Sequence, residues 1–220
     1  MQIALLGGTG DIGQGLALRW AQDTDHDVII GSREAEKAKA KAQEYETELA
    51  GRDCDVSIAG HENADAAAAA DVVVLSVPAY YLSDTIDAVA DSLGDAILVS
   101  PAVGMQRDED GIHYNPPGVG SVTALAAQAV DDVPVVGAFH NLAAGKLANL
   151  DAELDWDVPI VADDDDAKAT VSELADGIDG IRPLDAGGLA NASEVESLTP
   201  LLINLAANNE GLHDLGVKFW

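Results

Sequence analysis

The chain has 220 residues, of which 48% are hydrophobic and 23% charged, so we expect a folded domain with a sizeable core rather than a disordered chain. Eleven Lys and Arg against 39 Asp and Glu give a formal net charge of −28, which argues against binding to nucleic acid or to an anionic membrane. No apolar run reaches the roughly 18 residues of a membrane span. The amino terminus lacks a secretion-signal pattern, so we expect a cytoplasmic protein.

The acidic residues are spread along the chain, and we interpret the run at 163–166 as a solvated loop rather than a metal site. Molar salt shortens the screening length to about 3 Å, which would relieve the repulsion between so many like charges. The composition therefore resembles that of halophilic cytoplasmic proteins. The single cysteine, Cys54, excludes an internal disulfide and a thiolate zinc cluster.

Short apolar runs alternate with helical patterns along the chain. Strands are predicted at 3–6, 28–30, 56–58, 72–77, 97–99, 135–138, 159–161 and 181–184. Helices are predicted at 12–22, 35–50, 64–70, 81–93, 119–130 and 167–177. This alternation is typical of a Rossmann-type α/β fold, a doubly wound and mainly parallel sheet covered by helices on both faces.

A last helix is predicted from about Ser193, with Ser193 and Glu196 at the spacing of a capping box and a kink at Pro200. Its apolar positions are expected to pack inward: Val195, Leu198, Leu202 and Leu205. The pattern loosens near Gly145. We therefore expect a nucleotide-binding domain at 1–145 and a smaller C-terminal part at 146–220 that packs over the cofactor cleft.

A glycine-rich loop follows the first predicted strand. Gly8, Gly10 and Gly13 have the spacing G-x-G-x-x-G and precede a predicted helix, which is the context of a dinucleotide-binding loop. Unpaired N–H groups at the start of that helix would bind a pyrophosphate.

The second predicted strand ends in Ser32 and Arg33, where an enzyme specific for NAD usually carries an acid. Hydroxyl and guanidinium groups would instead donate hydrogen bonds to the 2′-phosphate of NADP. Lys37 lies one helical turn after Arg33 and is assigned to the same phosphate, whereas Lys39 and Lys41 are interpreted as partners of nearby glutamates.

Small polar residues and prolines follow three later strands, at 76–78, 100–101 and 140–141. Such residues are typical of a nicotinamide pocket, although they also simply end strands. His140 is the one histidine at such a position. The chain has no Tyr-x-x-x-Lys pair, G-x-S-x-G elbow or His-x-x-x-His spacing, which favours chemistry in which one cofactor reacts with another.

Several segments together resemble the archaeal NADPH:coenzyme F420 oxidoreductase family, here of haloarchaeal type. The resemblance lies in IALLGGTGDIGQGLALRWA, VIIGSREAEKAKAKAQEY, NLDAELDWDVPIVADDDDAK, GIRPLDAGGLANASEVESLTPLLINLA and GLHDLGVKF. It implies reversible hydride transfer between NADPH and a 5-deazaflavin, in a homodimer or higher homo-oligomer. The NADP residues that it implies, together with those inferred above, are Thr9, Gly10, Asp11, Ile12, Ser32, Arg33, Lys37, Ser76, Val77 and Ala144. The implied F420 residues are His140, Leu142, Ser197 and Leu215.

Hydride transfer needs two stacked rings and no covalent nucleophile, so we expect His140 and Ser197 to hydrogen-bond the deazaflavin and assign no residue an obligatory acid or base role. Two alternatives remain open at this point. One is an NADP-dependent reductase of a small imine or 2-keto substrate, with Lys146 or His140 as proton donor. The other is a non-catalytic NADP-sensing protein.

Overall fold

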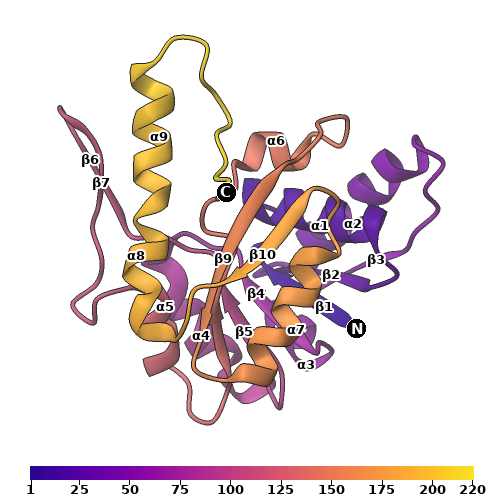
Figure 1. Cartoon of the computed structure of the whole chain (residues 1–220). Coiled ribbons are helices and arrows are strands. Elements are labelled where there is room, and N and C mark those ends of the chain that lie inside the picture. Colours follow the sequence, from indigo (N-terminus) through magenta and orange to yellow (C-terminus); the bar gives the residue numbers. More distant parts are fainter.

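The computed structural model describes all residues, 1–220, and contains one eight-stranded sheet of order β10-β9-β8-β5-β4-β1-β2-β3 (Figure 1). Its strands are β1 (Gln2–Leu6), β2 (Asp27–Ser32), β3 (Ile58–Glu62), β4 (Val72–Leu75), β5 (Ile97–Ser100), β8 (Val135–Gly137), β9 (Trp156–Ala162) and β10 (Ile181–Asp185). All neighbours are parallel except β8 and β9. The predicted Rossmann-like, mainly parallel fold is confirmed.

Helices cover both faces of the sheet, and β1 is therefore buried on both faces. Its alternate side chains belong to two separate cores. Ile3 and Leu5 pack with α1 (Asp11–Asp23), α2 (Ala35–Ala50), α6 (Ala144–Ala148) and α7 (Asp165–Asp176). Ala4 and Leu6 pack with α3 (Asn63–Ala68), α4 (Leu82–Val89) and α5 (Val122–Gln128). None of the helices is long and apolar enough to cross a membrane.

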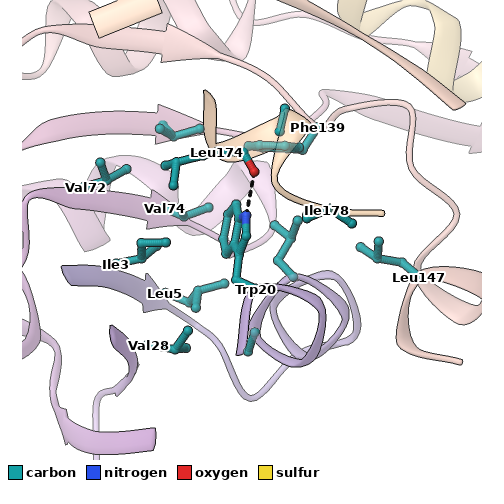
Figure 2. Close-up of a cluster of buried hydrophobic side chains, with 14 of the residues drawn as sticks. Ile3, Leu5, Trp20, Val28, Val72, Val74, Phe139, Leu147, Leu174 and Ile178 are labelled. Carbon is teal, nitrogen blue, oxygen red and sulfur yellow. Dashed lines mark hydrogen bonds between the residues drawn. The ribbon is translucent and has the colours of Figure 1, made fainter. Parts of the chain in front are cut away.

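Trp20 joins distant parts of the larger core (Figure 2). Its indole Nε1 donates a 2.8 Å hydrogen bond to the Leu174 carbonyl of α7, and its ring meets the Phe139 ring edge-on at 5.6 Å. This core and the sheet both run across residue 145, since β9, β10 and α7 follow it in the chain. The predicted division at 145 stays a prediction.

The region between β5 and β8 contains a hairpin that no sequence pattern indicated. Its strands, β6 (Met105–Asp108) and β7 (Gly111–Tyr114), form a separate two-stranded sheet beside α9 (Leu198–Asn208), as Figure 1 shows. All four residues of β6 are exposed, so the strand lacks the apolar alternation by which strands are recognised.

The C-terminal helix differs from its prediction. Residues 192–208 form α8 (Ala192–Glu196) and α9, separated at Ser197. The predicted capping box is wrong, because the Ser193 hydroxyl donates to Glu194 and the Glu196 side chain is buried elsewhere. The interruption predicted at Pro200 lies one turn earlier, at Ser197: Pro200 is in the first turn of α9, and without an N–H it cannot donate to the Glu196 carbonyl and so continue α8 into α9.

The inward packing predicted for the apolar positions is only partly right. Val195 is buried, Leu198 and Leu202 are half-buried, and Leu205 is 41% exposed, so the prediction for Leu205 is wrong. Leu201 on the same helix is 53% exposed. The helix α9 packs mainly beside the hairpin, with Asn204 bonded to the backbone of Ile112 on β7. One apolar side of the helix therefore faces solvent.

Candidate functional site

The loop between β1 and α1 has the shape of an anion-binding cradle. A Cβ at Gly13 would lie 2.6 Å from the Cα of Gly8, so the third glycine allows the helix to pack directly on the loop. No side chain caps α1 at Gly10. The first N–H groups of the helix, at Asp11 and Ile12, therefore have no helical partner and can bind a phosphate.

This loop borders a cavity of about 990 Å³ at the carboxyl ends of β1, β4 and β5. Six of the ten predicted NADP residues line it: Gly10, Asp11, Ile12, Ser76, Val77 and Ala144. The segments after β4 and β5 and the end of the hairpin supply most of the remaining wall. A crevice at this edge, beside the point where the strand order reverses, is where doubly wound sheets bind nucleotides.

Ser76 lies in the wall but already has a hydrogen-bond partner. Its hydroxyl donates to the Leu6 carbonyl at 2.9 Å, which joins the end of β4 to the end of β1. In this structure Ser76 therefore shapes the cavity wall beside the glycine loop.

The residues predicted to bind the 2′-phosphate lie at the end of β2 and the start of α2. Neither they nor Thr9 line the larger cavity. Ser32 is buried, and its Oγ accepts a 3.3 Å hydrogen bond from the Glu34 N–H. The Arg33 guanidinium lies 5.9 Å above the Tyr81 ring. Arg33 is exposed and makes no ion pair, which leaves its five donors available to a phosphate.

The three lysines of α2 each bond a glutamate three residues away. Lys37 pairs with Glu34 at 2.9 Å, and this bond lowers the pKa of the Glu34 carboxyl. Lys39 and Lys41 pair at the same distance with Glu36 and Glu44, as the sequence suggested for those two. To bind a phosphate, the Lys37 ammonium must either break its ion pair with Glu34 or contact the phosphate and Glu34 at the same time.

A second cavity of about 280 Å³ lies between the loop after β8, α9 and the C-terminal segment. Its wall includes two predicted F420 residues, Leu142 and Leu215, and seven of its ten lining residues are hydrophobic. Ala144 lines both cavities, so the two adjoin at the start of α6. An apolar slot beside a nucleotide cavity suits a flat ring system.

His140 and Ser197 line neither cavity. The His140 imidazole is buried, and this burial lowers its pKa to about 3, so the ring is neutral. Its Nε2 lies 3.4 Å from Thr123 Oγ1, and its Nδ1 has no partner. The Ser197 hydroxyl donates to the Glu194 carbonyl at 2.8 Å. Their contact with a deazaflavin stays a prediction.

Known proteins resemble this chain over nearly its whole length. The family model described as "NADP oxidoreductase coenzyme F420-dependent" matches residues 2–104. The F420-dependent NADP reductase of Methanothermobacter thermautotrophicus is 43% identical over 222 residues, covering 99% of this chain and 94% of that protein. The chain belongs to the F420-dependent NADP reductase family. The Methanocaldococcus jannaschii reductase is 40% identical over 208 residues, covering 93% of this chain and 92% of that protein.

Solved structures support the family assignment and the fold. A candidate F420-dependent NADP reductase of Arthrobacter sp. FB24 superposes with a TM-score of 0.82 at 25% identity, over 100% of this chain and 99% of that one. A pyrroline-5-carboxylate reductase of Coxiella burnetii has a TM-score of 0.57 at 17% identity, over 96% of this chain and 72% of that one. The second likeness concerns the fold alone.

Sequence reasoning missed the role of Glu196 in this member of the family. Its buried carboxylate accepts hydrogen bonds from the N–H groups of Val122 and Thr123 at 3.0 and 2.9 Å. It also accepts from the hydroxyls of Tyr114 and Thr123, both at 2.9 Å. Glu196 thus joins the hairpin, the start of α5 and α8 beside the larger cavity. Its four donors come from residues 73 to 82 positions away, so no local motif signals them.

Proposed function

We propose that this protein catalyses reversible hydride transfer between NADPH and the 5-deazaflavin coenzyme F420. The observation that carries the proposal is the pair of adjoining cavities that meet at Ala144. It is supported by the F420-dependent NADP reductases that match 93% or more of the chain. One coenzyme supplies the hydride and the other accepts it, so the protein has to bind, orient and shield two rings.

We assign the larger cavity to NADP and the smaller one to the deazaflavin ring. The N–H groups of Asp11 and Ile12 face the pyrophosphate, and Arg33, with Ser32 and Lys37, binds the 2′-phosphate. Leu142 and Leu215 enclose the second ring on apolar surfaces. The reacting carbons must approach to about 3–3.5 Å, and Ala144, with its small side chain, stands where the two cavities meet. In this arrangement residues 146–220 form the smaller C-terminal part that completes the deazaflavin site.

The phosphate assignment is tested with paired lysine and arginine variants. Arg33→Ala combined with Lys37→Ala should raise the KM for NADPH at least tenfold and leave the KM for NADH nearly unchanged. The matched control is Lys39→Ala with Lys41→Ala, which removes two other cations from α2, the helix that carries Lys37. Equal losses for both nucleotides, or an equal loss in the control, would contradict the phosphate assignment.

The activity itself is tested by mixing the protein with NADPH and oxidised F420 and following absorbance, against a panel of imines and 2-keto acids. F420 should be reduced and the panel should not. Reduction of a panel compound with inert F420 would favour the alternative reductase. That alternative is less well supported, because Lys146 lies 5.3 Å from the centroid of the Trp156 ring and neither Lys146 nor His140 lines either of the two cavities. Tight NADP binding without turnover would favour a sensing protein.

We further propose a halophilic, cytoplasmic homodimer or higher homo-oligomer. The net charge of −28 suits molar intracellular salt, in which its self-repulsion is screened. The exposed apolar side of α9, with Leu201 and Leu205, suits a second copy of the chain. Light scattering at a series of KCl concentrations tests the oligomeric state: we expect a stable dimer, and a monomer at every salt concentration would contradict the oligomer. Thermal unfolding in the same series tests the halophilic character, and the unfolding temperature should rise with salt.

A further inference from the structure

The last twelve residues, 209–220, form an irregular segment that we call the strap. It leaves the end of α9 and returns across the molecule toward α6 and β9, as the yellow coil in Figure 1 shows. Two of its residues, Asp214 and Leu215, line the smaller cavity. The larger cavity has no strap residue in its wall. The strap therefore shapes only the cavity assigned to the deazaflavin.

Gly216 holds the middle of the strap against β9. A Cβ at this position would overlap the indole ring of Trp156, which means that the strap backbone lies directly on the ring. Lys146 lies over the same ring, 5.3 Å from its centroid. Any larger residue at position 216 must displace the strap or the indole, and Leu215 is the next residue along the wall.

Asp157 holds the end of the strap. Its N–H donates to the Val217 carbonyl at 2.7 Å, and its Oδ2 accepts from the Phe219 N–H at 2.6 Å. Its Oδ1 lies 3.5 Å from the Lys218 ammonium, which also pairs with Asp155. The carboxylate is thus bonded or paired to two consecutive residues of the strap.

Arg182 completes the anchor from the neighbouring strand. It is the register partner of Asp157 in the β9–β10 pair. Its Nε and Nη2 donate to the two carboxylate oxygens at 2.8 and 2.6 Å, and Nη2 also donates to the Phe219 carbonyl at 2.7 Å. These bonds lower the pKa of the fully buried Asp157 carboxyl to about 2, so the anchor keeps its charge at all ordinary pH values.

The same aspartate also holds Asn141, another lining residue of the smaller cavity. Its carbonyl accepts a 2.8 Å hydrogen bond from the buried side-chain amide of Asn141, which lines the cavity next to Leu142. One residue of β9 is therefore bonded both to Asn141 and to the strap that carries Leu215, and both belong to the wall of the same cavity.

We propose that Asp157 is a positioning residue for the deazaflavin coenzyme, which sets the width of its slot by holding the strap and Asn141 on one strand. The inference rests on the proposed function. It makes the deazaflavin site dependent on residues 216–219, whereas the NADP site is independent of them. Loosening the anchor lowers affinity for F420 and raises its KM, without changing the affinity for NADPH or the rate at saturation.

The experiment uses three variants of the full chain: Gly216→Ala, Asp157→Asn and, as a matched control, Gly118→Ala, where an added Cβ meets no atom within 4 Å. Dissociation constants for F420 and NADPH are measured separately, by ultrafiltration and absorbance. For Gly216→Ala and Asp157→Asn, which we call the strap variants because both loosen the strap, we expect F420 affinity to fall at least tenfold and NADPH affinity to change less than twofold. The control should retain both affinities. Parallel losses for F420 and NADPH would show general damage and overturn the proposal.

A second readout follows the strap itself. Tryptic cleavage after Lys218 removes a Phe-Trp dipeptide, which intact mass spectrometry detects. Cleavage should be slow in the wild-type protein, where the Phe219 N–H is bonded to Asp157, slower still with F420 and several-fold faster in Asp157→Asn. NADPH alone should give no protection. Equal cleavage rates in the wild type and Asp157→Asn would show that the Asp157 side chain does not hold the strap, and would overturn the proposal.

The two proposals fail in different ways. If the wild-type protein neither binds nor reduces F420, the proposed function fails. If the wild-type protein binds F420 and both strap variants bind it equally well, only the positioning role of Asp157 fails.

Discussion

Replacing Glu196 with glutamine changes one atom and tests how the structure supports the larger cavity. Each carboxylate oxygen accepts one backbone N–H and one hydroxyl: Val122 N–H with Tyr114 on Oε2, and Thr123 N–H with the Thr123 hydroxyl on Oε1. A hydroxyl can rotate to accept from an amide NH2, whereas a backbone N–H cannot. Either orientation of glutamine therefore leaves one buried N–H facing another donor.

An unsatisfied buried N–H costs about 1–3 kcal/mol, and the remaining bonds lose their charge assistance. We therefore expect Glu196→Gln to lower the free energy of unfolding by about 2–4 kcal/mol. For a protein of this size the unfolding temperature should fall by roughly 5–15 °C. Denaturant and thermal unfolding, followed by circular dichroism at constant high salt, measure both values.

The control is Glu194→Gln, which removes the same charge two residues earlier from a side chain on the surface. Its unfolding midpoint should stay close to that of the wild type. Equal shifts in the two variants would show that net charge, rather than the four-donor arrangement, sets the stability. An unchanged midpoint in Glu196→Gln would show that the buried N–H groups of Val122 and Thr123 do not need the carboxylate.

Three further outcomes are expected. Gly13→Ala should destabilise the protein and weaken NADPH binding, because its Cβ would lie 2.6 Å from the backbone of the glycine loop. The control Gly118→Ala should do neither. An NADPH affinity of Gly13→Ala equal to that of the wild type would contradict the role of this loop in phosphate binding. Between pH 6.5 and 5, His140 binds a proton in the unfolded state but not in the folded state, where burial lowers its pKa. The free energy of unfolding should therefore fall with decreasing pH by at most about 1.4 kcal/mol per pH unit, and His140→Gln should reduce that slope. A slope unchanged by His140→Gln would mean that the folded ring titrates normally. Trp20→Phe should cost about 1–3 kcal/mol in denaturant unfolding through the lost bond to Leu174, and a loss within error would contradict the role of that bond.

The parallel strands and the glycine loop could be predicted because each has a local physical signature. Buried parallel strands appear as short apolar runs, and all eight predicted runs correspond to strands of the sheet, although β3 starts at Ile58, where the predicted run ends. The hairpin had no such signature, because β6 is exposed over its whole length. The break at Ser197 lies one turn before Pro200, whose missing N–H cannot continue the helical hydrogen-bond ladder, so the sequence located this interruption only to within one turn.

The site divides in the same way. Gly10, Asp11 and Ile12 were predictable from one local motif, and they line the cavity. Leu215 came from the family resemblance, and it lies in the smaller cavity. The anchor at Asp157 was invisible in the sequence, because it depends on a cross-strand partner, Arg182, and on the return of the C-terminal segment, which only the folded chain brings together.

The most direct test of the central claim uses NADPH carrying deuterium at the transferable position of nicotinamide C4, in ordinary water. We expect reduced F420 to gain that deuterium at C5 in one step, since the two cavities adjoin and no protein group carries the hydride. Full loss of the label to water, or no reduction of F420 at all, would contradict it.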